Sequence, residues 1–144
     1  MKEILLVEDS DTDAQAVERA LRALGVVNSI RRLRHGVEAM DYLVQAEQIA
    51  AVGPPLPSVL LLDVGLPGIS GFQILNYLQT RPAFAAPLKL VISQIGDISS
   101  IKQAYALGAQ SFLTKPINQT ELRELITGFP SHWLVRTKPS FASS

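Results

Sequence analysis

The 144-residue sequence contains no cysteine, which excludes disulfides, cysteine metal sites and thiol catalysis and fits a reducing cytosol. It also has no excess charge of either sign, because thirteen Lys and Arg residues balance thirteen Asp and Glu residues. Without net charge there is no bulk field to hold nucleic acid or an anionic membrane, so neither is expected as a direct partner. Any partner must recognise a local surface.

Long apolar runs are also absent. The first run, residues 4–7, ends at Glu8 and is too short for a signal peptide or a membrane span. We therefore expect a cytoplasmic protein. The length fits one compact domain, since domains cluster at about 100–150 residues.

Short apolar runs alternate along the chain with segments of helical periodicity. Continuous apolar runs predict strands buried on both faces, as in a parallel sheet. The clear runs are residues 4–7, 59–62 and 88–92, and weaker ones lie near residues 30–33 and 111–113. Apolar residues spaced by three or four follow each run and predict helices, the fourth carrying Ile98, Ile101 and Tyr105. Five strand–helix repeats predict a doubly wound α/β fold with a five-stranded parallel sheet and five helices.

Local signals support these helices. Ser70 with Gln73, and Asn118 with Glu121, have the spacing of capping boxes at helix starts. Gly25 and Gly108 stand where helices are expected to end in the left-handed conformation. The proline-rich residues 50–57 predict a loop.

The repeats end near residue 128. We therefore expect a domain at residues 1–128 and a C-terminal arm and tail at residues 129–144. The apolar group Trp133, Leu134 and Val135 is expected to cover a patch on its own domain or on a second copy. Residues 139–144 are predicted to be disordered.

Polar side chains follow the predicted strands where each one ends. Glu8 and Asp9 follow the first strand, Asp63 the third, Ser93 the fourth and Lys115 the fifth. In doubly wound sheets, sites form outside these carboxyl ends. Two carboxylates about 4 Å apart repel by about 4 kcal/mol at an effective dielectric of 20, so a cation must share the site. Mg²⁺ fits, because it prefers hard oxygen ligands and a phosphate oxygen.

Asp63 is the best candidate nucleophile, since a carboxylate at a strand end can attack phosphorus to give an acyl phosphate. Glu8, Asp9 and the backbone carbonyl of Gly65 would complete the metal site with Asp63. Ser93 and Lys115 would contact the phosphoryl oxygens.

Each residue also has a simpler interpretation. The segment from Glu8 to Asp11 could be a solvated helix start, and Lys115 and Ser93 could be ordinary loop and strand-end residues. The joint occurrence of these groups at successive strand ends favours the functional interpretation.

Four segments carry a family resemblance: LLVEDS (5–10), LLLDVGLPGISG (60–71), LVISQ (90–94) and GAQSFLTKPI (108–117). Over residues 2 to about 128 the sequence resembles a response-regulator receiver domain. The resemblance implies the flavodoxin-like strand order 2-1-3-4-5 and a phosphohistidine donor on a sensor histidine kinase. It also implies a cis bond at Lys115-Pro116 and a switch formed by Ser93 and Phe112, although Phe112 could be a plain core aromatic. Such a protein is no enzyme beyond its own phosphorylation and dephosphorylation.

Within the family, the HGVEAMDYL stretch from His35, the proline-rich loop and the arm are similar to the small receivers that partner bacterial and cyanobacterial phytochromes. This resemblance implies a bacteriophytochrome kinase as partner and a homodimer that involves the arm.

Three residues depart from the family pattern. Glu8 replaces a more usual aspartate, Gln94 replaces a small residue, and Gly65 leaves no side chain two residues past Asp63. The last two would change acyl-phosphate lifetime in opposite directions.

Other functions on the same fold fit less well. A flavin or nucleotide site would be repelled by Glu8 and Asp9, and a haloacid-dehalogenase-like phosphatase needs an aspartate where Gly65 stands. A receiver-like interaction module that works without phosphorylation remains the main alternative.

Overall fold

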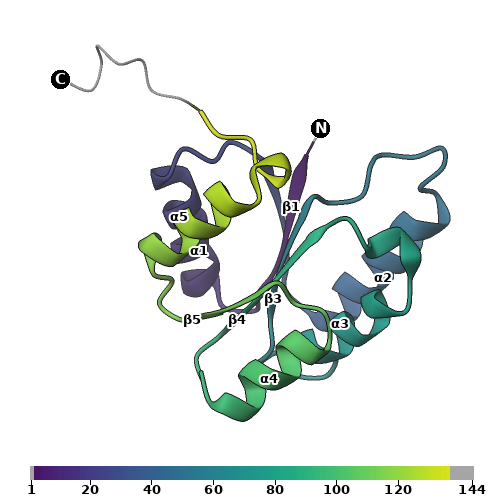
Figure 1. Ribbon diagram of the computed structural model, residues 1–144. Helices are drawn as coiled ribbons and strands as arrows, with labels where there is room; N and C mark the ends of the chain where they lie inside the picture. Colours follow the sequence, from purple (N-terminus) through teal and green to yellow (C-terminus); the bar gives the residue numbers. More distant parts are fainter. Residues whose placement is uncertain (1, 137–144) are drawn as a thin grey trace.

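The computed structural model describes residues 2–136 and shows one parallel sheet between two layers of helices (Figure 1). The strands are β1 (Glu3–Val7), β2 (Ser29–Leu33), β3 (Val59–Asp63), β4 (Leu88–Ser93) and β5 (Ser111–Thr114), in the order β2-β1-β3-β4-β5. The helices are α1 (Asp11–Ala23), α2 (Gly36–Gln48), α3 (Gly71–Gln79), α4 (Ile98–Ala106) and α5 (Gln119–Gly128). Short 3₁₀ turns, η1 (Pro82–Phe84) and η2 (Pro130–His132), follow α3 and α5. The predicted doubly wound fold and its strand order are confirmed.

Two apolar clusters hold the layers together. In Figure 1, α1 and α5 lie on one side of the sheet, and α2 and α3 lie on the other. One cluster joins α1, α5 and the arm to the sheet, and the second joins α2, α3 and α4 to its other face. Successive residues of β1, β3 and β4 alternate between the two clusters, so these strands are buried on both faces and read as continuous apolar runs.

Most of the helix signals have the expected role. Ser70 Oγ accepts from the backbone N–H of Gln73 while Gln73 Oε1 accepts from the N–H of Ser70, which completes a capping box. Asn118 caps α5 by accepting from the Glu121 N–H at 3.0 Å, and within the described residues no return bond from the Glu121 side chain is present. Gly25 and Gly108 have φ of 86° and 96°, in the left-handed region that favours glycine.

The prediction of which α4 residues face the core is wrong in part. Ile98 is 72% exposed and Tyr105 is 49% exposed, whereas the small Ala104 is buried and Ile101 is half-buried. A helix that packs through alanine can approach the sheet closely, and its larger residues then lie at the sides. Periodicity alone predicts an apolar stripe but not which part of it faces the core.

The arm packs against its own domain. Trp133 is buried in the cluster that contains α1 and α5. Val135 forms an antiparallel bridge with Val26, and the Val27 N–H donates to the Leu134 carbonyl at 2.7 Å. Trp133 therefore covers a patch on its own domain, while Val135 remains 46% exposed. The predicted disorder of residues 139–144 falls outside the described residues.

Among residues 2–136, none of the helices combines the length and apolar character needed to cross a bilayer.

Candidate functional site

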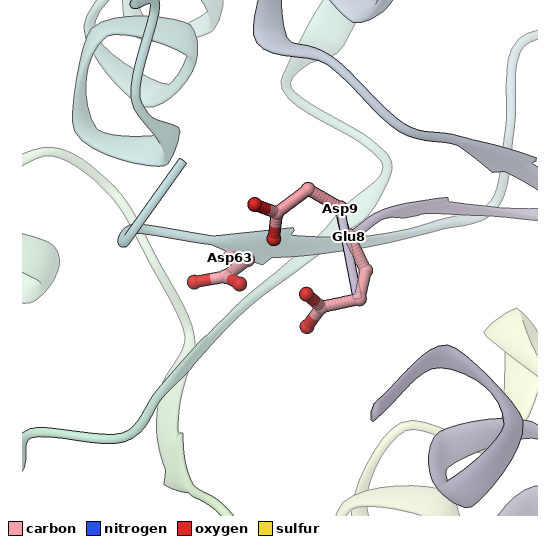
Figure 2. Close-up of side chains that lie close together, drawn as sticks. All are labelled: Glu8, Asp9 and Asp63. Carbon is pink, nitrogen blue, oxygen red and sulfur yellow. The ribbon is translucent and has the colours of Figure 1, made fainter. Parts of the chain in front are cut away.

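The candidate site lies at the carboxyl ends of β1 and β3. Because β1 and β3 are parallel with Val7 opposite Leu62, the residues that follow, Glu8 and Asp63, emerge at the same edge of the sheet. Figure 2 shows the carboxyl groups of Glu8, Asp9 and Asp63 gathered in one place. One oxygen from each lies within 4.8 Å of the others, so the structure brings these predicted residues together.

Lys115 supplies the positive charge at this site. Its Nζ lies 2.6 Å from Glu8 Oε1, 2.9 Å from Asp63 Oδ2 and 2.9 Å from Asp13 Oδ2. Glu8 is fully buried, and the side chains of Asp63 and Lys115 are 7% and 10% exposed. These charges are therefore little screened by solvent.

Burial and pairing shift the pKa values of two of these groups. Burial raises the pKa of Glu8 to about 7, and the close Lys115 ammonium offsets only part of that effect. For Lys115, burial alone would lower the pKa, but the ionic contact with Glu8 and the hydrogen bonds to Asp13 and Asp63 outweigh it and raise the pKa above its ordinary value. A single ammonium therefore pairs with several carboxylates, so the site holds fewer positive groups than carboxylates.

The donor set fits a divalent metal ion. Three carboxylates offer hard oxygen ligands within a small volume, which is the chemistry that Mg²⁺ prefers. Glu8 Oε1 is buried and, despite its short ionic contact with Lys115, lacks a well-directed hydrogen bond to any described residue. A buried oxygen left in this way is available to a cation.

Glycines around Asp63 keep the space beside it open. The Gly65 N–H donates to Asp63 Oδ1 at 2.7 Å and orients the carboxylate, while a Cβ at Gly65 would lie 3.3 Å from the same oxygen. At Gly71, the first residue of α3, a Cβ would lie 2.7 Å from the Asp63 carbonyl oxygen, so only glycine lets α3 start so close to β3.

Ser93 and Lys115 are joined through the backbone. Ser93 is buried at the end of β4, its carbonyl accepts from the Lys115 N–H at 2.8 Å, and its hydroxyl accepts from the Ile95 N–H at 3.1 Å. The Lys115-Pro116 peptide bond is cis. Phe112 is 9% exposed and packs with the cluster on the α2–α4 side, and Gln94 is exposed.

Sequence reasoning missed Asp13 and Arg32. Asp13 stands in the first turn of α1 and pairs with Lys115, and its place four residues after Asp9 at a helix start was the available signal. Arg32 in β2 donates two hydrogen bonds to the Glu8 carbonyl, at 3.0 and 2.9 Å, and pairs with Asp11. Inspecting the end of the second predicted strand, as was done for the other strands, would have identified Arg32.

Comparison with known proteins defines the class. The family model described as response regulator receiver domain matches residues 4–127, so the chain belongs to the receiver family of two-component response regulators, which are generally signalling proteins rather than enzymes.

Individual proteins of similar length also resemble this chain over most of its residues. Response regulator Rcp1 of Synechocystis is 30% identical over 92% of this chain and 89% of its own length. The probable methanogenesis regulatory protein FilR2 of Methanothrix harundinacea is 31% identical over 91% of this chain and 83% of its own. The crystal structure of the phosphorylated cyanobacterial phytochrome response regulator RcpA superposes with a TM-score of 0.71 at 29% identity, covering 95% of this chain and 96% of that one.

Proposed function

We propose that this protein accepts a phosphoryl group on Asp63 from a phosphohistidine of a sensor histidine kinase. The observation that carries the proposal is the buried Asp63 carboxylate, held 2.9 Å from Lys115 and within reach of the Glu8 and Asp9 oxygens. A carboxylate nucleophile needs orientation and charge neutralisation more than it needs a strong base.

The reaction is an in-line transfer. An oxygen of Asp63 forms a bond to phosphorus while the P–N bond to the donor imidazole breaks, and the imidazole leaves with the electron pair of that bond. The Gly65 N–H donates to Asp63 Oδ1. The other carboxylate oxygen, Oδ2, lies 2.9 Å from the Lys115 ammonium. Lys115 and the Ser93 hydroxyl then contact the phosphoryl oxygens; Ser93 accepts from the Ile95 N–H, so its own O–H is free to donate.

Glu8, Asp9, Asp63 and the carbonyl of Gly65 would hold Mg²⁺, which supplies charge neutralisation to the transferring phosphoryl group. Arg32 fixes the Glu8 backbone at this site through its two hydrogen bonds to the carbonyl oxygen. Movement of Ser93 and Phe112 would carry the signal to the surface formed by α4, β5 and α5.

The Asp63→Asn variant is expected to lose phosphorylation completely. The full chain is incubated with Mg²⁺ and acetyl phosphate and weighed intact, and the wild type should gain the mass of one phosphoryl group. Asn keeps the shape of the side chain but lacks the nucleophilic carboxylate, so no gain is expected. Asp97→Asn, in the exposed turn before α4, is the matched control and should label like the wild type.

Labelling that survives in Asp63→Asn would overturn the assignment of the acceptor. A wild type that gains no mass with Mg²⁺ and also none from a histidine kinase would favour the alternative, an interaction module that works without phosphorylation.

For the kinase partner we infer a phytochrome-type sensor. The similarity to the phytochrome response regulator RcpA over nearly the whole of both chains supports this inference. The receiver would signal by protein contact.

We also infer a homodimer that uses the arm. Val135 is 46% exposed and lies where the arm pairs with Val26, in the segment before β2. Val135→Glu is expected to shift sedimentation at micromolar concentration from dimer to monomer, because a charge would be buried without a partner. Val52→Glu, at a position 90% exposed in the loop before β3, is the control and should sediment as the wild type does. A wild type that is monomeric throughout would contradict the inference.

A further inference from the structure

A buried lysine lies at the opposite end of β4 from Ser93. Lys89 is the second residue of β4 and is 6% exposed. Its neighbours Leu88 and Leu90 face the cluster that contains α1 and α5, so the Lys89 side chain lies on the face of α2, α3 and α4. The receiver chemistry described above does not use it.

This ammonium has no ion-pair partner among the described residues. It donates to the Pro87 carbonyl at 3.0 Å, and within residues 2–136 it forms no ion pair with a carboxylate. The residues outside that range contain no Asp or Glu side chain. An ammonium has three donors, so two remain for other acceptors. Burial lowers the pKa of Lys89, as expected for a cation away from water.

Lys89 opens into a pocket of about 270 Å³ between α3, η1 and the end of α4. Pro82, Ala85 and Leu107 provide the accessible apolar surface, and Thr80 and Gly108 also line the pocket. The other cationic residue that lines it, Arg81, is already paired with Glu47 at 2.9 Å. The pocket therefore combines an apolar wall with a single uncompensated ammonium.

We propose that this pocket binds a small organic carboxylate whose apolar body packs on Pro82, Ala85 and Leu107 while its carboxylate pairs with Lys89. A carboxylate supplies the two missing acceptors and the missing negative charge, and a charge-assisted bond in a buried site is stronger than a neutral one. The volume is below that of typical drug-sized sites, so the ligand must be small. The site lies at the opposite end of the sheet from Asp63 and is independent of phosphoryl transfer.

The test compares benzoate with its neutral isostere benzamide on the full chain, followed by ¹H–¹⁵N NMR titration. Benzoate is expected to shift the amides of Thr80 and Gly108 and to bind about tenfold more tightly than benzamide. Lys89→Met keeps an apolar side chain of similar length and should remove this preference. Lys102→Met, an exposed lysine on α4, should keep it.

The proposal fails if benzoate shifts neither amide, if benzoate and benzamide bind equally well to the wild type, or if Lys89→Met retains the preference. The comparison of the two compounds on the wild type decides the matter even if Lys89→Met does not fold.

Discussion

Lys115→Met is expected to lower the free energy of unfolding by about 3 kcal/mol at pH 8 without Mg²⁺, because it leaves the buried carboxylates of Glu8 and Asp63 without their cation. The pKa of Lys115 is raised on folding, so its stabilisation is fully present below the ordinary value of 10.5 and is lost only above it. Urea denaturation followed by circular dichroism measures the effect.

Two conditions should reduce this loss. The pKa of Glu8 is about 7 with Lys115 in place and is higher without that ammonium, so lowering the pH protonates Glu8 and reduces its repulsion from Asp63. Mg²⁺ should restore stability at pH 8 by replacing the missing positive charge. Lys102→Met is the matched control and should change stability by less than about 0.5 kcal/mol. A Lys115→Met protein as stable as the wild type at pH 8 would show that the carboxylates do not repel one another.

Trp133→Ala is expected to destabilise the protein by about 3–5 kcal/mol, the usual cost of removing a large buried aromatic side chain. Trp133 is 4% exposed and belongs to the same cluster as Leu21 and Val26, so its loss leaves a cavity between the arm and the domain. Since Trp133 is the single tryptophan, unfolding must be followed by circular dichroism rather than by fluorescence.

Two further variants make this prediction sharper. Trp133→Phe should cost much less than the alanine variant, because the indole Nε1 is buried without a hydrogen-bond partner among the described residues and phenylalanine removes that unsatisfied group. Val135→Ala, at a half-exposed position of the same arm, should change stability by less than about 0.5 kcal/mol. Equal, small effects at positions 133 and 135 would mean that the arm is not part of the core.

Because Trp133 is part of the core, the Val135→Glu variant tests the dimer better than a shortened chain does. A chain that ends at Gly128 removes Trp133 from the core, so a change in its sedimentation could come from lost stability. The Val135→Glu variant leaves Trp133 in place and tests the interface alone.

Much of the fold could be predicted because the signals are local. The continuous apolar runs of β1, β3 and β4 indicated strands buried on both faces, and Ser70 with Gln73 indicated the start of α3. The orientation of α4 was beyond such reasoning, because the exposure of Ile98 depends on how closely Ala104 approaches the sheet.

Some residues of the candidate site could likewise be predicted from the sequence, and others could not. Glu8, Asp9, Asp63 and Lys115 could be selected from sequence because each lies at or just past the end of a parallel strand, and parallel strands end at one edge. Asp13 lies inside a helix and Arg32 inside an edge strand, where charged residues are ordinarily solvated. Only their contacts with Lys115 and the Glu8 carbonyl give them a part in the site.

The sequence by itself determined the class of fold, the strand ends that carry the acidic residues, and the family, because these depend on apolar periodicity and on residue types at fixed spacings. The tertiary structure alone decided that one ammonium is shared among Glu8, Asp13 and Asp63, that Trp133 completes the core of its own domain, and that Lys89 is buried without an ion-pair partner in residues 2–136. These features depend on distances between residues remote in sequence, which packing sets and local pattern does not.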